Sequence, residues 1–345
     1  MPFINDRLAD NQEQRDRQRH ANAPPRASRF VFEPERVMAL LRARLVGQEP
    51  VLAALEDTLQ VLKADLADPH RPLAVHLFVG PTGVGKTETA RLLAEAIHGR
   101  PDALCRIDMN TLAQEHYAAA LTGAPPGYVG SKEGHTLFDV DAIQGSFSKP
   151  GIVLFDELEK ADTTVLRTLL NVLERGHLPL SGGTRSLDFR NSLILMTSNT
   201  GAADAAARRR RRDQGWRRWL GASPKREQRR LDQALRARFD PEFLNRIDAI
   251  HHFQPLGEDR LDALLDIELH KLHQRLARRD LTLTLDNTAR AWLRQHHDPH
   301  YGARHLTRRL RTHLHPPLAR ALLNHPDHTH FHATLHQDHL HITPE

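Results

Sequence analysis

The segment GPTGVGKT at residues 80–87 constrains the fold of this chain more than any other part of its sequence. It matches the spacing G-x-x-x-x-G-K-[ST] of a phosphate-binding loop, which needs a strand before it and a helix after it. Both flanks are present, because the apolar run LAVHLFV precedes the segment and the helical pattern KTETARLLAEAIHG overlaps its end. The segment therefore predicts a phosphate site in an α/β protein.

The residue types of this loop suit a nucleoside triphosphate with its magnesium ion. Glycines let the backbone wrap a phosphate, and successive N–H groups and the helix N-terminus face its charge. Lys86 would reach the β- and γ-phosphate oxygens, and the Thr87 hydroxyl would ligate Mg²⁺. ATP and Mg²⁺ are therefore the expected cofactors.

Polar side chains also end two further apolar strands. The strand IVLFDE closes with Asp156 and Glu157, and the strand LILMTSN closes with Asn199. Open α/β sheets bind ligands at the carboxyl ends of their strands. Asp156 can hold Mg²⁺ through a water, Glu157 can orient an attacking water, and Asn199 can contact that water or the γ-phosphate. Without the phosphate-binding loop, the two acidic residues would simply favour the start of the next helix.

The order of patterns along the chain predicts two folded domains after a tail. Residues 1–28 are polar and charged with no apolar period, which predicts a disordered tail. Residues 29–256 alternate apolar strands with helices, which predicts a parallel sheet covered by helices on both faces. Residues 257–345 are mostly helical, and the alternating end HTHFHATLHQDHLHIT predicts a short β hairpin in this smaller domain.

Composition excludes several classes of protein. No run approaches the ~18 to 20 apolar residues that cross a bilayer, and the start of the chain lacks the apolar middle of a signal peptide. A cytoplasmic protein without a membrane partner is therefore expected. Cys105 is the single cysteine, so neither an intrachain disulfide nor a zinc site of several thiolates can form.

The basic character of the chain invites a nucleic-acid hypothesis. The formal charge is +5, and residues 208–212 read RRRRR. Only seven of the 48 basic residues are lysines, however, and the remaining 41 arginines are spread along the chain. This distribution favours a general residue bias over a dedicated binding face, so nucleic acid is not an expected main partner.

The motifs, taken in order, resemble the Clp/heat-shock-100 family of AAA+ ATPases, and within it the second ATPase module of ClpB, ClpA and ClpV. The resembling segments run from about residue 44 to residue 323 and cover most of the chain. They are LVGQEPVLAAL, LADPHRP, GPTGVGKTE, RIDMN, GAPPGYVG, LFDELEKA, DFRNSLILMTSN, FDPEFLNRID, FQPLGEDRL and YGARHLTRRL. The resemblance implies an AAA+ P-loop fold with a small helical C-terminal domain.

The resemblance also implies roles for matching residues. Val46 and Gln48 would lie near the adenine, while Asp156, Glu157 and Asn199 would keep the Mg²⁺, general-base and first-sensor roles described above. The residues that would surround the rest of the nucleotide are Gly80, Pro81, Thr82, Gly83, Val84, Gly85, Lys86, Thr87 and Glu88. Arg246 matches the arginine finger that reaches into a neighbouring subunit, and Arg304 matches the second sensor.

A finger supplied by a neighbour implies a ring, most commonly a homo-hexamer. In such rings the segment GAPPGYVGSKEG at residues 123–134 faces the channel, where Tyr128 and Val129 would grip an extended polypeptide. The implied function is an ATP-driven unfoldase or remodelling chaperone. Two alternatives are a ClpV-like motor dedicated to one protein complex and a nucleic-acid-associated AAA+ protein that uses residues 208–212.

Some residues depart from the family pattern. The pore-loop sequence EGG reads Glu133-Gly134-His135 here, and the first ATPase ring and folded N-terminal domain of ClpB and ClpA have no counterpart in the polar tail. Protease-coupled members carry an Ile-Gly-Leu-like tripeptide where this chain has Trp219-Leu220-Gly221, so docking to ClpP is not expected.

The last fifty residues are rich in histidine. His328, His330 and His332 alternate along the predicted strand, which places them on one face where they could in principle bind a metal. The favoured interpretation is a solvent-facing side of a hairpin that shares the residue bias of the chain.

Overall fold

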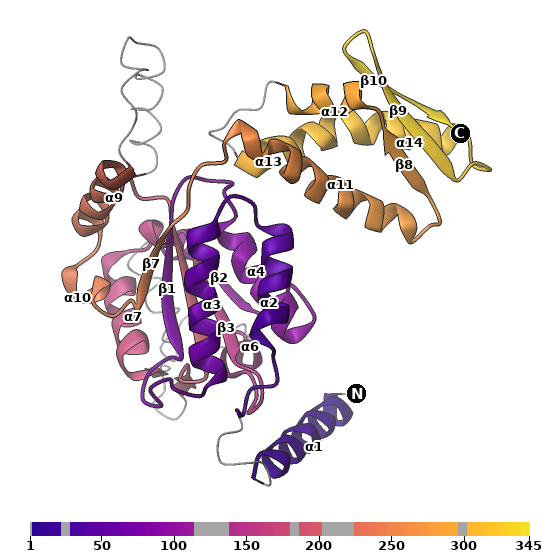
Figure 1. Cartoon of the computed structure of the whole chain (residues 1–345). Helices are drawn as coiled ribbons and strands as arrows, with labels where there is room; N and C mark the ends of the chain where they lie inside the picture. The colour runs from indigo at the N-terminus through magenta and orange to yellow at the C-terminus, as the bar shows by residue number, and fades with distance from the viewer. Residues whose placement is uncertain (1, 22–27, 114–137, 180–185, 202–223, 296–301) are drawn as a thin grey trace, which may run out of the picture. The chain divides into compact units, whose positions relative to one another are not determined.

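The structure is a computed structural model that describes residues 2–21, 28–113, 138–179, 186–201, 224–295 and 302–345. The chain divides into two compact units (Figure 1). The first comprises residues 1–80 and 86–253, and the second comprises residues 81–85 and 254–345. Each unit has its own main sheet and its own apolar core.

The first unit follows the predicted alternation of strands and helices. Its elements in chain order are α1 (Pro2–Ala21), α2 (Pro34–Arg44), α3 (Glu49–Lys63), β1 (Ala74–Val79), α4 (Lys86–His98), β2 (Cys105–Asp108), η1 (Met109–Leu112), α6 (Val140–Gln144), β3 (Gly151–Asp156), η3 (Leu158–Lys160), α7 (Thr163–Arg175), β4 (His177–Pro179), β5 (Ser186–Asp188), β6 (Ser192–Ser198), α9 (Pro224–Arg238), α10 (Pro241–Leu244) and β7 (Ala249–His252). The pair β4–β5 and the strand β7 were not predicted from the sequence.

The main sheet is five-stranded and parallel throughout, in the order β2-β3-β6-β1-β7. Every residue of β1, β3 and β6 is buried, as expected for strands with both faces covered. On one face Val75, Leu77 and Val79 join a core that includes residues of α7. The opposite face of β1 carries His76, whose ring lies beside Thr58 of α3. The predicted α/β fold with helices on both faces is therefore confirmed.

The second unit is mostly helical. Its elements are η5 (Glu258–Arg260), α11 (Leu261–Ala277), β8 (Thr282–Leu285), α12 (Asn287–Arg294), α13 (Gly302–Arg309), a π-helical segment η6 (Leu310–Leu314), α14 (His315–Asn324), β9 (His330–His336) and β10 (His339–Pro344). The predicted hairpin is the antiparallel pair β9–β10. Strand β8 adds to it in parallel with β9, so the small sheet has three strands.

The N-terminal residues differ from the expected disordered tail, because the structure forms α1 over Pro2–Ala21. Residues 3–21 hold neither glycine nor proline, and Arg17 pairs with Glu13 one turn earlier at 2.6 Å. Such pairs and strong helix formers stabilise a helix without an apolar face. Among the described residues, no helix combines the length and apolar character needed to cross a bilayer.

Two histidines are buried together in the sheet, one on β1 and one on β7. Nε2 of His251 lies 2.8 Å from Nδ1 of His76, and Nε2 of His76 lies 3.3 Å from the Thr58 hydroxyl. Burial lowers the pKa of His76 from 6.5 to about 4. Burial, followed by the charges of His76 and His252, lowers the pKa of His251 to about 3. Both rings are therefore neutral near pH 7.

This buried pair makes the first unit acid-sensitive. The unfolded chain takes up protons on these rings near pH 6.5, whereas folded His76 resists protonation until about pH 4. The free energy of unfolding is therefore highest above pH 6.5 and falls as the pH drops through this window, by roughly 3 kcal/mol for His76 alone. Urea unfolding across the window should show a smaller loss in a His76→Leu, His251→Leu variant. The exposed control His341→Leu should behave like the unmodified chain, and equal losses in all three would contradict the assignment.

Candidate nucleotide site

The loop between β1 and α4 has the backbone that its glycines predict. Gly83 and Gly85 have φ values of +76° and +107°, which are accessible mainly to glycine. A Cβ on Gly80 would lie 2.5 Å from the carbonyl oxygen of Phe253, which follows β7. Glycine at position 80 is therefore required by close packing of the backbone, and the glycines at 83 and 85 by the turn itself.

Lys86, the first residue of α4, is buried and directed back toward the loop. Its ammonium donates to the carbonyl oxygen of Gly80 at 2.7 Å and to Oδ1 of Asn199 at 2.9 Å. Asn199 directly follows β6, which pairs with β1, so the strand order brings these residues together. The structure thus joins Lys86 at the start of α4 to Asn199 at the end of β6.

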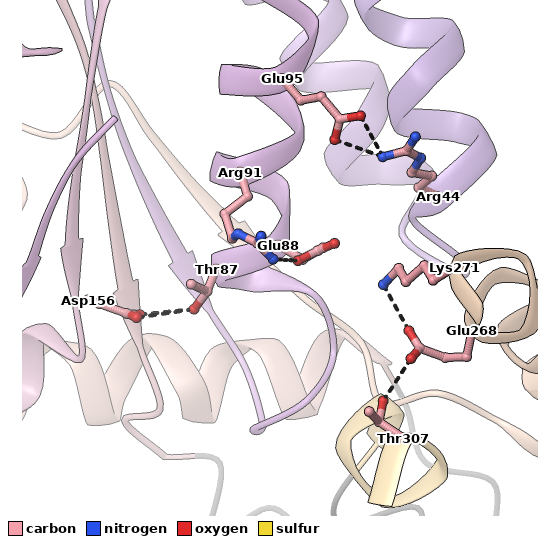
Figure 2. A network of polar contacts seen from close by, with 9 residues as sticks. All are labelled: Arg44, Thr87, Glu88, Arg91, Glu95, Asp156, Glu268, Lys271 and Thr307. Carbon is pink, nitrogen blue, oxygen red and sulfur yellow. Dashed lines mark hydrogen bonds and ion pairs between the residues drawn. The ribbon is translucent and has the colours of Figure 1, made fainter. Parts of the chain in front are cut away.

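Asp156 ends β3 and is joined to the next residue of α4. The Thr87 hydroxyl donates to Oδ1 of Asp156 at 3.0 Å (Figure 2). The Thr197 hydroxyl donates to the same oxygen at 2.5 Å, and Arg106 of β2 donates to Oδ2 at 2.6 Å. Side chains from two neighbouring strands and one helix therefore fix the Asp156 carboxylate, whose side chain is only 8% exposed.

Glu157 has an unusual backbone conformation immediately after β3. Its φ and ψ of 59° and 50° lie in the left-handed region, which costs a non-glycine residue of order 1 kcal/mol or more. Its backbone N–H donates to the Thr197 hydroxyl at 2.9 Å, which helps to hold this conformation. Strained residues of this kind cluster at active sites. The turn directs the chain away from the strand and leaves the Glu157 side chain partly exposed.

Sequence reasoning missed Glu159, which continues the chain of contacts. Nδ2 of Asn199 donates to Oε1 of Glu159 at 3.1 Å, while Oε2 is buried with no hydrogen-bond partner among the described residues. Arg238 of α9 donates to the backbone carbonyls of Glu159 and Ala161 and so holds this short segment. Glu159 therefore fixes the amide of Asn199 that faces Lys86. The motif LFDELEKA contains the residue, but only the folded chain shows its partner.

Thr197 and Arg106 were also not predicted. Thr197 is the penultimate residue of β6 and follows the apolar run LILM. Its hydroxyl nevertheless donates to Asp156 and accepts from the backbone N–H of Glu157. Arg106 follows Cys105 in an alternating strand and is paired with Leu154 of β3, so its side chain reaches two residues along that strand to Asp156. The sequence points to Thr197 and Arg106 as site residues only through their positions near the carboxyl ends of strands.

The residues present fit a nucleotide and a hard divalent cation. The Thr87 hydroxyl and the Asp156 carboxylate are oxygen donors of the type Mg²⁺ prefers, and they lie within hydrogen-bond distance of each other. Lys86 and the N-terminus of α4 supply positive charge next to a glycine loop. The same arrangement has no sulfur or imidazole donor that would favour a softer metal.

The remaining expected nucleotide residues lie as follows. Gln48 is 1% exposed and occupies the N-cap position of α3, and Val46 is half-buried two residues earlier. Glu88 lies in the first turn of α4, where it pairs with Arg91 at 3.0 Å. In the second unit Arg304 is exposed in the first turn of α13.

The loop residues 81–85 belong to the second unit by their contacts. Within that unit the N–H of Ala303 donates to the carbonyl oxygen of Gly83 at 2.9 Å. A Cβ on Gly302 would approach the same oxygen to 2.5 Å, so glycine is needed at that position as well. The first turn of α13, which carries Arg304, therefore lies against residues 81–85 within the second unit.

Arg246 lies beyond α10 on a firmly held backbone. Arg71 donates to the carbonyl oxygen of Arg246 at 3.3 Å and pairs with Asp248 at 2.8 Å. The Arg246 side chain is 40% exposed and pairs with Glu174 of α7 at 2.9 Å. The structure therefore does not bring Arg246 to Lys86 or Asp156 among the contacts of this chain.

Several expected residues lie outside the described part of the chain. These are Tyr128, Val129, residues 208–212 and the tripeptide Trp219-Leu220-Gly221. His328 precedes β9, whereas His330 and His332 of β9 face the hydroxyls of Thr282 and Thr284 at 2.6 and 2.7 Å. Within the described ranges, no group of three or more metal-binding side chains of histidine, cysteine, aspartate or glutamate occurs.

Two family models match successive parts of the chain. Residues 71–250 match the AAA domain (Cdc48 subfamily), and residues 256–332 match the C-terminal, D2-small domain, of ClpB protein. The two matches meet close to the division between the two compact units after residue 253. The fold and the family model therefore agree on a nucleotide-binding module followed by a small helical domain.

Relatives of two lengths are similar to this chain. An ATP-dependent protease ATP-binding subunit-like protein AmiB of Pseudomonas aeruginosa is 46% identical over 350 residues, which cover 94% of this chain and 93% of that protein. Chaperone protein ClpB of Propionibacterium freudenreichii is 40% identical over 282 residues, which cover 81% of this chain but 30% of ClpB. A closed-state reconstruction of Hsp104 with ATPγS and FITC casein has a TM-score of 0.76 at 28% identity, covering 90% of this chain and 51% of that one.

Proposed function

The chain belongs to the Clp/Hsp100 family of AAA+ ATPases, and from this premise we propose that it uses ATP hydrolysis to unfold or remodel other proteins by threading them through a ring. The observation that carries the proposal is the joined set of contacts at the strand ends. Lys86 meets Asn199, and Thr87 meets Asp156, beside the strained backbone of Glu157. A cytoplasmic location is part of this proposal.

Each residue of the set has a distinct task in this proposal. Lys86 binds the β- and γ-phosphate oxygens, and Asn199 orients the γ-phosphate or the attacking water. Thr87 and Asp156 would hold Mg²⁺, which neutralises phosphate charge when it is bound. Glu157 orients the water and accepts its proton. Glu159 keeps the amide of Asn199 in place through the contact at 3.1 Å.

The ring is proposed to be a homo-hexamer in which Arg246 and Arg304 complete the site. Arg246 would leave its exposed partner Glu174 and reach the γ-phosphate in a neighbouring subunit. Arg304 would report the nucleotide state to the small domain, since its helix begins against the phosphate loop. The Hsp104 reconstruction contains casein, which supports a polypeptide as the substrate class here.

Tyr128 and Val129 are proposed to grip that polypeptide in the channel. An aromatic ring binds an extended chain through apolar contact that tolerates many sequences. Tyr128→Ala should therefore slow ATP-dependent unfolding of a fluorescent model substrate by roughly tenfold or more, equivalent to about 1.4 kcal/mol of lost contact. Its ATPase rate without substrate should stay unchanged.

Tyr128→Phe is the matched control, because it keeps the ring and removes only the hydroxyl. It should unfold the model substrate at nearly the rate of the unmodified protein. The pore assignment fails if Tyr128→Ala unfolds that substrate as fast as Tyr128→Phe does.

A further inference from the structure

The second unit contains a polar pocket, open to solvent and hereafter called the cavity, that the nucleotide chemistry does not use. It has a volume of about 390 Å³ and is bordered by α11, α13, η6 and the start of α14. Its polar lining residues are Glu268, Lys271, Arg275, Thr307, Arg311 and His315. Four of these six side chains are basic, so the lining favours a negatively charged ligand.

Local sequence explains how the lining converges. Glu268, Lys271 and Arg275 follow each other at spacings of three and four, which places them on one face of α11. The π-helical segment contributes Leu310 and Arg311 to the lining, and the N–H of His315 donates to the carbonyl oxygen of Leu310 at its end. Proline at 316 and 317 lacks the N–H of a regular helix, and such wide turns occur frequently at functional sites.

The single carboxylate of the lining is already engaged. Nζ of Lys271 donates to Oε1 of Glu268 at 2.8 Å, and the Thr307 hydroxyl donates to Oε2 at 3.1 Å (Figure 2). The Glu268 side chain is 13% exposed, so these contacts fix it against the wall. Glu268 therefore balances Lys271 and leaves the other basic groups without a counter-charge from this residue.

Those other groups are Arg275, Arg311 and His315. Arg275 donates through Nε to the backbone carbonyl of Lys271, and neither guanidinium pairs with a carboxylate among the described residues. Burial, followed by the positive charges of Arg275 and Arg311, lowers the pKa of His315. The two guanidinium groups, whose side chains are exposed, therefore both oppose protonation of the His315 imidazole.

We propose that this cavity is a binding site for a small phosphate-class anion, such as pyrophosphate or a phosphorylated metabolite, separate from the phosphate loop. Arg275 and Arg311 would each present a planar pair of N–H donors to phosphate oxygens. His315 would add a third donor from the start of α14. The volume is within the range of small-molecule sites, and the site adds a ligand that the proposed ATPase cycle does not require.

Calorimetric titration of the full chain with pyrophosphate tests this site. Saturating ADP would first occupy the phosphate loop, and ionic strength would be held constant with sodium chloride. One further binding event is expected, and Arg275→Gln with Arg311→Gln should weaken it by about tenfold or more, as expected for lost charge-assisted hydrogen bonds. Arg320→Gln, an exposed change on α14, should leave it unchanged.

Nuclear magnetic resonance gives a second measurement, the pKa of His315, which would not change with pyrophosphate if the two arginines had only a structural role. Bound anion favours the imidazolium form, so pyrophosphate should raise the pKa of His315 against the opposing effect of burial, Arg275 and Arg311. The His315 resonance is assigned by its loss in His315→Gln. The proposal is overturned if ADP-saturated protein shows no further binding, or if the arginine double variant binds pyrophosphate as well as Arg320→Gln does.

Discussion

Glu157→Gln should bind ATP with nearly the affinity of the unmodified protein while its hydrolysis rate falls by about 10²- to 10⁴-fold. The amide has the shape of the carboxylate but cannot accept a proton from water. The backbone N–H of Glu157 is fixed on the Thr197 hydroxyl and is unaffected by the substitution, so the strained turn should persist. Single-turnover hydrolysis together with equilibrium binding of fluorescent ATP would measure both quantities.

Lys86→Ala is the informative control for this prediction. Lys86 links the loop carbonyl of Gly80 to Asn199, so its removal should weaken nucleotide binding itself. The two variants should therefore differ, with binding retained in Glu157→Gln and lost in Lys86→Ala. Parallel losses of binding in both, or normal turnover in Glu157→Gln, would contradict a general-base role.

The ATP-bound Glu157→Gln protein also separates two forms of the proposed function. A general remodelling ATPase held with bound ATP should retain many different polypeptides. A motor dedicated to one assembly should retain one partner and its direct neighbours. Mass spectrometry of proteins that co-purify with the variant, compared with Lys86→Ala, distinguishes these outcomes.

The main sheet was predictable because β1, β3 and β6 are mostly apolar runs between helical patterns. The phosphate loop marked the carboxyl end of β1. Because the strands are parallel, Asp156 and Asn199 lie at the same, carboxyl-terminal edge of the sheet. Strand β7 escaped prediction because its sequence AIHH combines two apolar residues with two histidines. Only pairing with β1, which buries His251 against His76, makes it a strand.

Side-chain partners between distant segments were not predictable. Glu159 reaches Asn199 across 40 positions, and Arg246 reaches Glu174 across 72. Both contacts depend on how loops leave the sheet, which no local periodicity encodes. The π-helical segment is similar, because a helical pattern continues through Leu310–Leu314 while the hydrogen-bond spacing changes. The loop that contains Tyr128 lies outside the described residues, so its role rests on the motif.

The geometry around Arg246 suits a finger that acts on another subunit. The preceding helix α10 is anchored by Phe243, which stacks on Phe239 in the core, with ring centroids 5.9 Å apart. Arg71 holds the backbone from the other side. Within the described ranges, the side chain itself has only an exposed pair with Glu174, and such pairs contribute about 0 to 1 kcal/mol. A rigid base with a weakly held guanidinium needs little energy to exchange partners.

Arg246→Ala should therefore lower ATP hydrolysis by about 10³-fold or more without unfolding the protein, because a finger stabilises charge that develops on the γ-phosphate. Glu174→Gln, which removes only the partner within the chain, should keep normal turnover and serves as the matched control. Mixing inactive Arg246→Ala with inactive Glu157→Gln subunits then decides where the finger acts. A mixed ring contains sites that pair an intact Glu157 with an Arg246 from the neighbour, so hydrolysis should reappear in proportion to those pairs. A mixture as inactive as its components would show that Arg246 serves its own subunit or none.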